Sequence, residues 1–76
     1  MEPGKLYRVN DYAVSDAADY AYRNRQHVRD DGWLWVWSED DSGSDNPEAH
    51  SMRSVATGRY AWFLTSELEA ADAEDR

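Results

Sequence analysis

The stretch Trp33-Leu34-Trp35-Val36-Trp37 places a tryptophan at every second position, with an aliphatic residue between neighbouring tryptophans. On a β-strand, alternate side chains point to opposite faces of the sheet. The three tryptophans would therefore share one face, and Leu34 and Val36 would share the other. A strand that is apolar on both faces is typical of the centre of a small β fold, or of a strand that offers one face to a partner.

Both uses of the tryptophan face stay open from the sequence. It can pack in the core, or it can leave a tryptophan exposed as an interface anchor, a role in which Trp and Tyr are enriched. For the core, we expect the side chains of Leu34, Val36, Trp62 and Leu64 to be mostly buried. For an interface, Trp35 or Trp37 and Tyr60 are the candidate anchors.

The 76 residues predict a single small domain, residues 1–76, with four Trp, five Tyr and one Phe to build its core. The chain has no cysteine, so disulfides and Cys-based zinc sites are excluded. Residues 1–5 show no basic region followed by an apolar run, so we expect no signal peptide. No apolar run approaches the roughly 20 residues of a membrane span. We therefore expect a cytoplasmic protein that binds no membrane.

Negative charge is concentrated in the second half of the chain. The formal net charge is −8, and residues 38–76 hold ten acids against three bases, a net of −7. Such a surface repels nucleic-acid phosphates and favours a protein partner with a basic surface. We expect no direct binding to nucleic acid.

The rest of the chain divides into further elements. A first strand is predicted at 5–9, and a helix at about 16–25 capped by Ser15, with an irregular loop over 15–28 as the alternative. Residues 39–51 read as a flexible acidic loop. A hairpin of 52–56 and 59–65 follows, turning at Gly58, and then a capping box, Ser66-Glu67-Leu68-Glu69, starts a short helical turn. Residues 70–76 read as a frayed acidic tail.

Residues 59–69, Arg-Tyr-Ala-Trp-Phe-Leu-Thr-Ser-Glu-Leu-Glu, resemble the end of SH3-like small barrels. In that family an aromatic strand leads into one helical turn closed by a leucine, here Leu68. The resemblance implies a mainly β fold, a small SH3-like barrel of about five strands, with the 15–28 segment inserted and the helical turn near its C-terminus. It also implies a binding role, toward peptides, proteins or nucleic acid.

Catalytic and metal-binding patterns are weak. Ser51, His50 and Asp45 form an imaginable triad, but all three fall in the expected loop, where rigid support is lacking. Asp40, Asp41, Asp45 and Glu48 do not have the spacing of a calcium loop, since Gly43 falls where a ligand is needed. We expect neither an enzyme nor a cofactor or metal site.

The sequence therefore predicts a small acidic, non-enzymatic protein-interaction module that binds a basic surface on a partner. An alternative is an inhibitor that mimics nucleic acid, such as a phage protein blocking a host DNA- or RNA-binding protein. The predicted contact residues are Trp35, Trp37, Tyr60, Glu39, Asp40 and Asp41.

Overall fold

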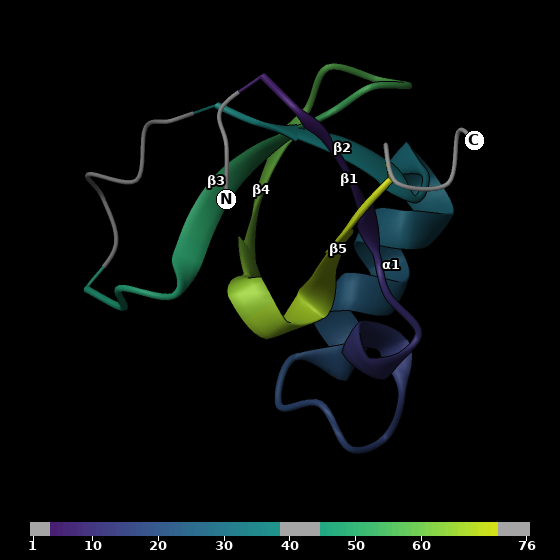
Figure 1. The fold of residues 1–76 in the computed structure, drawn as a ribbon. Coiled ribbons are helices and arrows are strands. Elements are labelled where there is room, and N and C mark those ends of the chain that lie inside the picture. Colours follow the sequence, from purple (N-terminus) through teal and green to yellow (C-terminus); the bar gives the residue numbers. More distant parts are fainter. Residues whose placement is uncertain (1–3, 39–44, 72–76) are drawn as a thin grey trace.

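The computed structural model describes residues 4–38 and 45–71, which form one sheet and one α-helix (Figure 1). Short 3-10 turns, η1 and η2, precede the helix and the last strand. In chain order the elements are β1 (Leu6–Val9), η1 (Tyr12–Val14), α1 (Ala21–Asp31), β2 (Leu34–Trp37), β3 (Ala49–Ser54), β4 (Tyr60–Leu64), η2 (Thr65–Glu67) and β5 (Leu68–Ala70).

The strands form a five-stranded antiparallel sheet in the order β4-β3-β2-β1-β5. The first and last strands are neighbours, because β5 pairs with β1 through the register Arg8↔Glu69. The mainly β prediction is therefore confirmed. Among the described residues, no pairing joins the edge strands β4 and β5, so the sheet is not closed into a barrel.

The sheet buries one face and leaves the other toward solvent. The buried face carries the core, in which Trp35 and Phe63 pack edge to face with ring centroids 4.9 Å apart. The buried core cluster consists of Tyr7, Val9, Ala13, Trp35, Met52, Ala61 and Phe63. The expectation that Leu34, Val36, Trp62 and Leu64 are mostly buried was wrong for Leu34, which is 40% exposed, while the other three are partly buried. None of the four belongs to the buried core cluster.

The physical reason is that period-two alternation identifies two faces without saying which one lies inside. Both faces of β2 and β4 are apolar, so the choice is made by what covers the sheet. Helix α1 covers the face of Trp35 and Phe63, and His27 of α1 lies within 6.3 Å of both rings.

The helix begins five residues later than predicted. Ser15 does not cap it: the Ser15 hydroxyl donates to the Tyr12 carbonyl oxygen and accepts from the Ala17 backbone N–H, which closes a local turn instead. The buried face of α1 carries Ala21, Asn24 and Asp31. Two of these three are polar, so the spacing of apolar residues alone does not mark this face.

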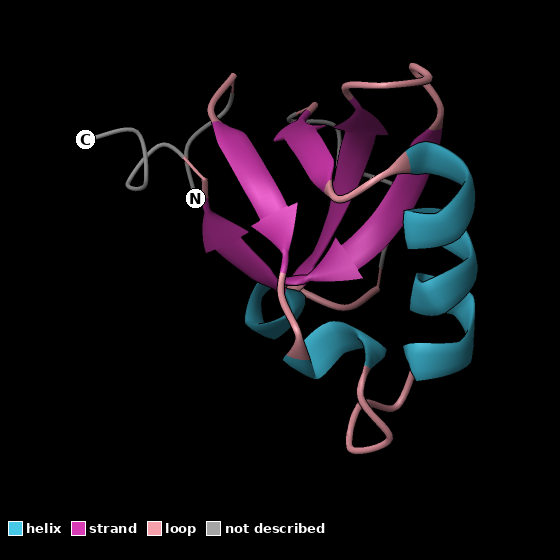
Figure 2. Cartoon of the chain, turned by 90° about the vertical axis from the view of Figure 1, so that its right-hand side faces the viewer, coloured by secondary structure: helices cyan, strands magenta, loops and turns pink. Residues whose placement is uncertain are grey.

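Helix α1 runs along the free edge of β4 (Figure 2). In the first turn of the helix, the Arg23 guanidinium donates a hydrogen bond to the Trp62 carbonyl oxygen. At the last residue of the helix, the Asp31 carboxylate accepts a hydrogen bond from the Thr57 hydroxyl at 2.8 Å. The Arg23 side chain therefore occupies one backbone oxygen on the edge strand β4, which another chain would need in order to extend the sheet there.

The hairpin is confirmed, with its strands at 49–54 and 60–64 and Gly58 at φ +78° in the turn. The loop prediction was partly wrong, because residues 49–51 belong to β3 and pair with β4. Residues 39–44 lie outside the described part of the chain.

The short helical turn after β4 is present, but its cap differs from the prediction. Glu67, not Glu69, reaches back, and its Oε1 accepts a hydrogen bond from the Leu64 backbone N–H at 2.7 Å. The tail prediction was wrong at its start: Ala70 belongs to β5 and Ala71 is buried, while residues 72–76 lie outside the described residues.

Candidate functional site

The solvent face of the sheet carries an apolar patch. Residues directly opposite one another in an antiparallel pair share a face. Tyr60 lies opposite Arg53, which lies opposite Val36, which lies opposite Leu6, so these four form one row across the sheet. Leu34, Tyr60 and Val55 are 40%, 63% and 53% exposed. We call the set Leu34, Val36, Val55, Tyr60 and Trp62 the outer patch.

Trp62 lies at one end of this patch, near the acidic part of the chain. It pairs with Ser51, whose carbonyl oxygen accepts hydrogen bonds from the Ser38 backbone N–H and hydroxyl. Ser38 is the residue before Glu39, Asp40 and Asp41 in the chain. Ser38, the last described residue before the acidic stretch of the sequence, therefore lies in the same cross-strand row as Trp62.

A pocket of about 290 Å³ opens beside Trp62, where the start of α1 meets β4. Tyr20 and Arg23 line it from the helix side, and Asp45 and Asn46 line it from the segment that leads into β3. Ala49, Trp62, Phe63 and Leu64 supply the apolar part of its wall.

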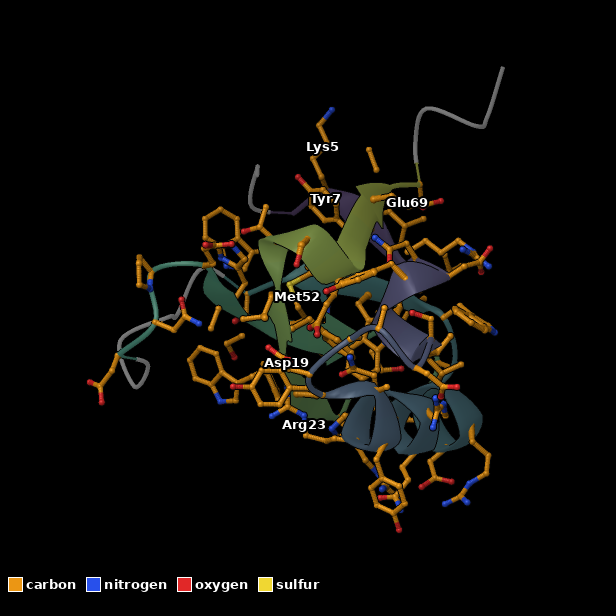
Figure 3. The ribbon with its side chains drawn as sticks, turned by 90° about the horizontal axis from the view of Figure 1, so that it is seen from below. Lys5, Tyr7, Asp19, Arg23, Met52 and Glu69 are labelled. Carbon is orange, nitrogen blue, oxygen red and sulfur yellow. The ribbon has the colours of Figure 1, made fainter. Side chains whose placement is uncertain are left out.

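Arg23 is the cation of this pocket. Its Nη2 donates to the Trp62 carbonyl oxygen at 3.1 Å, and its guanidinium carbon lies 4.7 Å from the centroid of the Tyr20 ring. The side chain lies at the start of α1, close to Asp19 and away from the buried Met52 (Figure 3). Within residues 4–38 and 45–71, Arg23 forms no ion pair.

The predicted anchors do not form one surface. Trp35 has no exposed surface, and its Nε1–H donates to the Gly32 carbonyl oxygen at 2.9 Å, so its proposed role as a contact residue is corrected to a core role. Trp37 lies on the covered face, partly buried, with its ring 5.3 Å from that of His50. Tyr60 alone of these three is largely exposed on the outer face. Glu39, Asp40 and Asp41 lie outside the described residues.

Trp62, Tyr20 and Arg23 are the site residues that sequence reasoning missed. The sequence does place Trp62 on one face of its strand together with Tyr60 and Leu64. The alternation did not show which face lies inside, and Trp62 and Leu64 were expected in the core. Tyr20 and Arg23 gave no signal, because a single exposed aromatic and a single arginine are ordinary on a helix.

The imagined catalytic triad is not assembled. His50 and Ser51 are neighbours on β3, so their side chains point to opposite faces, and His50 Nε2 lies 2.7 Å from Thr65 Oγ1. Among the described residues, no group of three His, Cys, Asp or Glu side chains is placed to hold a metal ion.

Two polar clusters hold α1 in place. Asn24, fully buried, donates through Nδ2 to the Ala13 carbonyl oxygen at 2.9 Å and to Glu67 Oε2 at 3.0 Å. At the other end of the helix, the Asp31 carboxylate accepts from Thr57 and lies 3.6 Å from Arg59 Nε. Both clusters tie the helix to turns that follow strands.

Two titrating groups on α1, His27 and Asp30, have lowered pKa values. Burial against the aromatic core lowers the pKa of His27, and the nearby positive charge of Arg23 lowers it further, against smaller opposing effects of Asp31 and Asp30. A hydrogen bond from Arg29 lowers the pKa of Asp30. Neither group lines the pocket.

Comparison of the chain with protein families, curated proteins and solved structures gave no match. Within the described residues, no helix has the length and apolar character needed to cross a membrane.

Proposed function

We propose that this protein is a small non-enzymatic interaction module that binds a partner protein with a basic surface. The observation that carries the proposal is the outer patch, which presents Tyr60 and Leu34 exposed, and Trp62 partly buried, on the solvent face of the sheet. Aromatic side chains held on strands make effective interface anchors, because little conformational entropy is lost when they bind.

The distribution of charge supports a basic partner. The described residues hold nine acids and seven bases, a net of −2, so the remaining residues contribute −6 of the total of −8. Part of that charge, Glu39, Asp40 and Asp41, directly follows Ser38 in the sequence, and Ser38 lies in the Trp62 row. Negative charge beside an apolar anchor steers a basic surface toward it and makes association salt-dependent.

We also propose that the fold is an SH3-like small barrel. The strand order β4-β3-β2-β1-β5 and the single helical turn between β4 and β5 support it. Fold alone would not identify the ligand, so the patch and the charge carry the functional argument.

Nucleic-acid mimicry is the alternative function, and the same experiments distinguish it from the interaction module. A mimic needs unpaired acids arrayed on a rigid face. Of the nine described acids, five are in ion pairs with arginine, as Asp16 is with Arg25 at 2.7 Å. This pairing favours the interaction module.

The test is site-specific photo-crosslinking in a host lysate at low and high salt, with benzoylphenylalanine in place of Tyr60. The control replaces Tyr22, which is 75% exposed on α1. We expect one protein to be captured at position 60 and not at position 22, and less of it at high salt. Equal capture at both positions would contradict the outer patch as the interface.

Charge reversal then tests whether the acidic residues attract the basic partner. Asp40→Lys with Asp41→Lys should weaken capture at low salt, while Asp11→Lys with Asp16→Lys, which changes the net charge equally, should weaken it less. If both double variants behave alike, only the total charge matters. If the captured protein binds DNA or RNA and this chain displaces that nucleic acid competitively, mimicry replaces the module.

A further inference from the structure

The pocket between α1 and β4 has the features of a selective site inside the proposed interface. Its wall is aromatic and aliphatic, from Tyr20, Trp62 and Leu64, and it carries one positive and one negative side chain. A volume of about 290 Å³ is at the lower end for small-molecule sites, which run from about 300 to 1,000 Å³. The pocket therefore suits one side chain of a partner better than a cofactor.

Arg23 is held in a fixed orientation before any ligand arrives. The hydrogen bond to the Trp62 carbonyl oxygen uses Nη2, and the guanidinium carbon lies 4.7 Å from the centroid of the Tyr20 ring, a cation–π contact that restricts its movement. Each contact reduces the entropy that binding would otherwise cost. The remaining N–H groups of this planar fork match a carboxylate.

The charges of the pocket do not neutralise each other. Arg23 and Asp45 form no ion pair, and Asp45 has no hydrogen bond or ion pair to the described residues. Asp45 is therefore not held in a fixed position by them, whereas Arg23 is. An arginine that has no carboxylate partner among the described residues and lies beside an aromatic ring is the stronger recognition element of the two.

We propose that this pocket receives an aromatic or aliphatic side chain of the partner protein, with a neighbouring carboxylate of that partner paired to Arg23. The inference rests on the proposed function and specifies its contact. The basic surface of the partner supplies the long-range attraction to this acidic chain. The single carboxylate of the partner that pairs with Arg23 supplies the selectivity. Trp62 connects the two, since it lines the pocket and ends the outer patch.

The experiment titrates nitrogen-15-labelled protein with three capped peptides and follows the Arg23 Nε–H and Trp62 indole N–H signals by NMR. The peptides are acetyl-Gly-Phe-Glu-Gly-amide and its Gln and Lys counterparts. We expect the Glu peptide to bind about tenfold more tightly than the Gln peptide, the change that about 1.4 kcal/mol from a charge-assisted hydrogen bond produces. The Lys peptide should bind most weakly.

Variants assign the effect to Arg23. Arg23→Gln should remove the preference for Glu over Gln, and Arg23→Lys should keep only part of it, because lysine lacks the planar fork. Arg53→Gln is the matched control, since Arg53 is also exposed and without an ion pair among the described residues but lies in the middle of the sheet. It should leave the preference unchanged.

Equal affinity for the three peptides, tighter binding of the Lys peptide, or no shift at millimolar concentrations would overturn the inference. The proposed function fails separately, by equal crosslinking at positions 60 and 22. If position 60 captures a partner while the peptides show no Glu preference, the module stands and the assignment of the pocket is wrong.

Discussion

At the scale of single residues, Trp35 and Trp62 show how differently two tryptophans are used. Trp35 is fully buried, with its indole N–H bonded to the Gly32 carbonyl oxygen, and it packs on Phe63. Trp62 is partly buried and lines the pocket. Stability should therefore depend on the first and binding on the second.

We expect Trp35→Ala to lower the free energy of unfolding by about 3–5 kcal/mol, as large truncations in cores do. Trp62→Ala should cost only about 1 kcal/mol, near the average for single substitutions. Urea denaturation followed by circular dichroism compares the two variants with the parent. A Trp62→Ala variant less stable than Trp35→Ala would mean that Trp62 belongs to the core.

His27 gives a second prediction at this scale. Its pKa in the folded protein lies below the ordinary 6.5, so the unfolded chain binds its proton first as the pH falls. The stability contributed by neutral His27 is fully present above pH 6.5 and is lost as the pH falls from there toward the folded-state pKa.

Replacing His27 by Gln should remove the part of the stability loss at low pH that comes from protonation of this histidine. The measurement is the free energy of unfolding from pH 7.5 to pH 5, compared between parent and variant, so that the carboxylates common to both cancel. His50→Gln shows whether the effect belongs to this histidine. A parent and a His27→Gln variant with parallel pH profiles would contradict the prediction.

At the scale of elements, α1 is positioned by buried polar contacts more than by an apolar stripe. Asn24 ties it to η1 and to Glu67, and Asp31 ties it to the turn of the hairpin. These bonds fix the helix along the edge of β4, and so decide which face of the sheet becomes the core. They also place Arg23 over the pocket.

Asn24→Asp tests this arrangement. It would bring a second carboxylate within about 3 Å of the buried Glu67, the present Nδ2–Oε2 distance being 3.0 Å. Two such groups cannot both ionise without a large cost. We expect strong destabilisation at pH 7 that is partly relieved at pH 5, whereas Asn24→Ala should destabilise without that relief. Urea denaturation at the two pH values distinguishes them.

At the scale of the whole molecule, the two ends of the described chain hold each other. Strand β5 pairs with β1, the Asn10 N–H donates to the Glu67 carbonyl oxygen at 2.9 Å, and the Ala71 N–H donates to the Leu6 carbonyl oxygen at 3.1 Å. Since β1 also pairs with β2, loss of β5 would expose the edge of a strand that carries Tyr7 and Val9 into the core.

Truncation after Ala71 should therefore leave the fold intact, because every described pairing is kept. Truncation after Glu67 removes β5 and should leave the chain mostly unfolded. Amide exchange of Tyr7 and Val9 reports the difference directly. Strong protection of these amides in the shorter chain would show that β1 does not need β5.

The sequence by itself determined β1, β2, β4, the second half of β3, the hairpin at Gly58, the helical turn after β4 and the mainly β class, but not β5 or the start of β3. These follow from local alternation and turn chemistry, which act over a few residues. It also showed an acidic second half, which is a property of composition. It did not determine where α1 begins, because the buried face of that helix contains the polar residues Asn24 and Asp31.

Only the tertiary structure decided which face of the sheet lies inside. Both faces are apolar, so the pattern of β2 and β4 fits either choice, and α1 selects one of them by covering it. The same choice buried Trp35, exposed Tyr60 and left Trp62 beside a pocket. Arg23 and Tyr20 became site residues for a related reason: they are 39 and more residues from Trp62 in the chain, and only the packing of the helix on the edge of β4 brings them together.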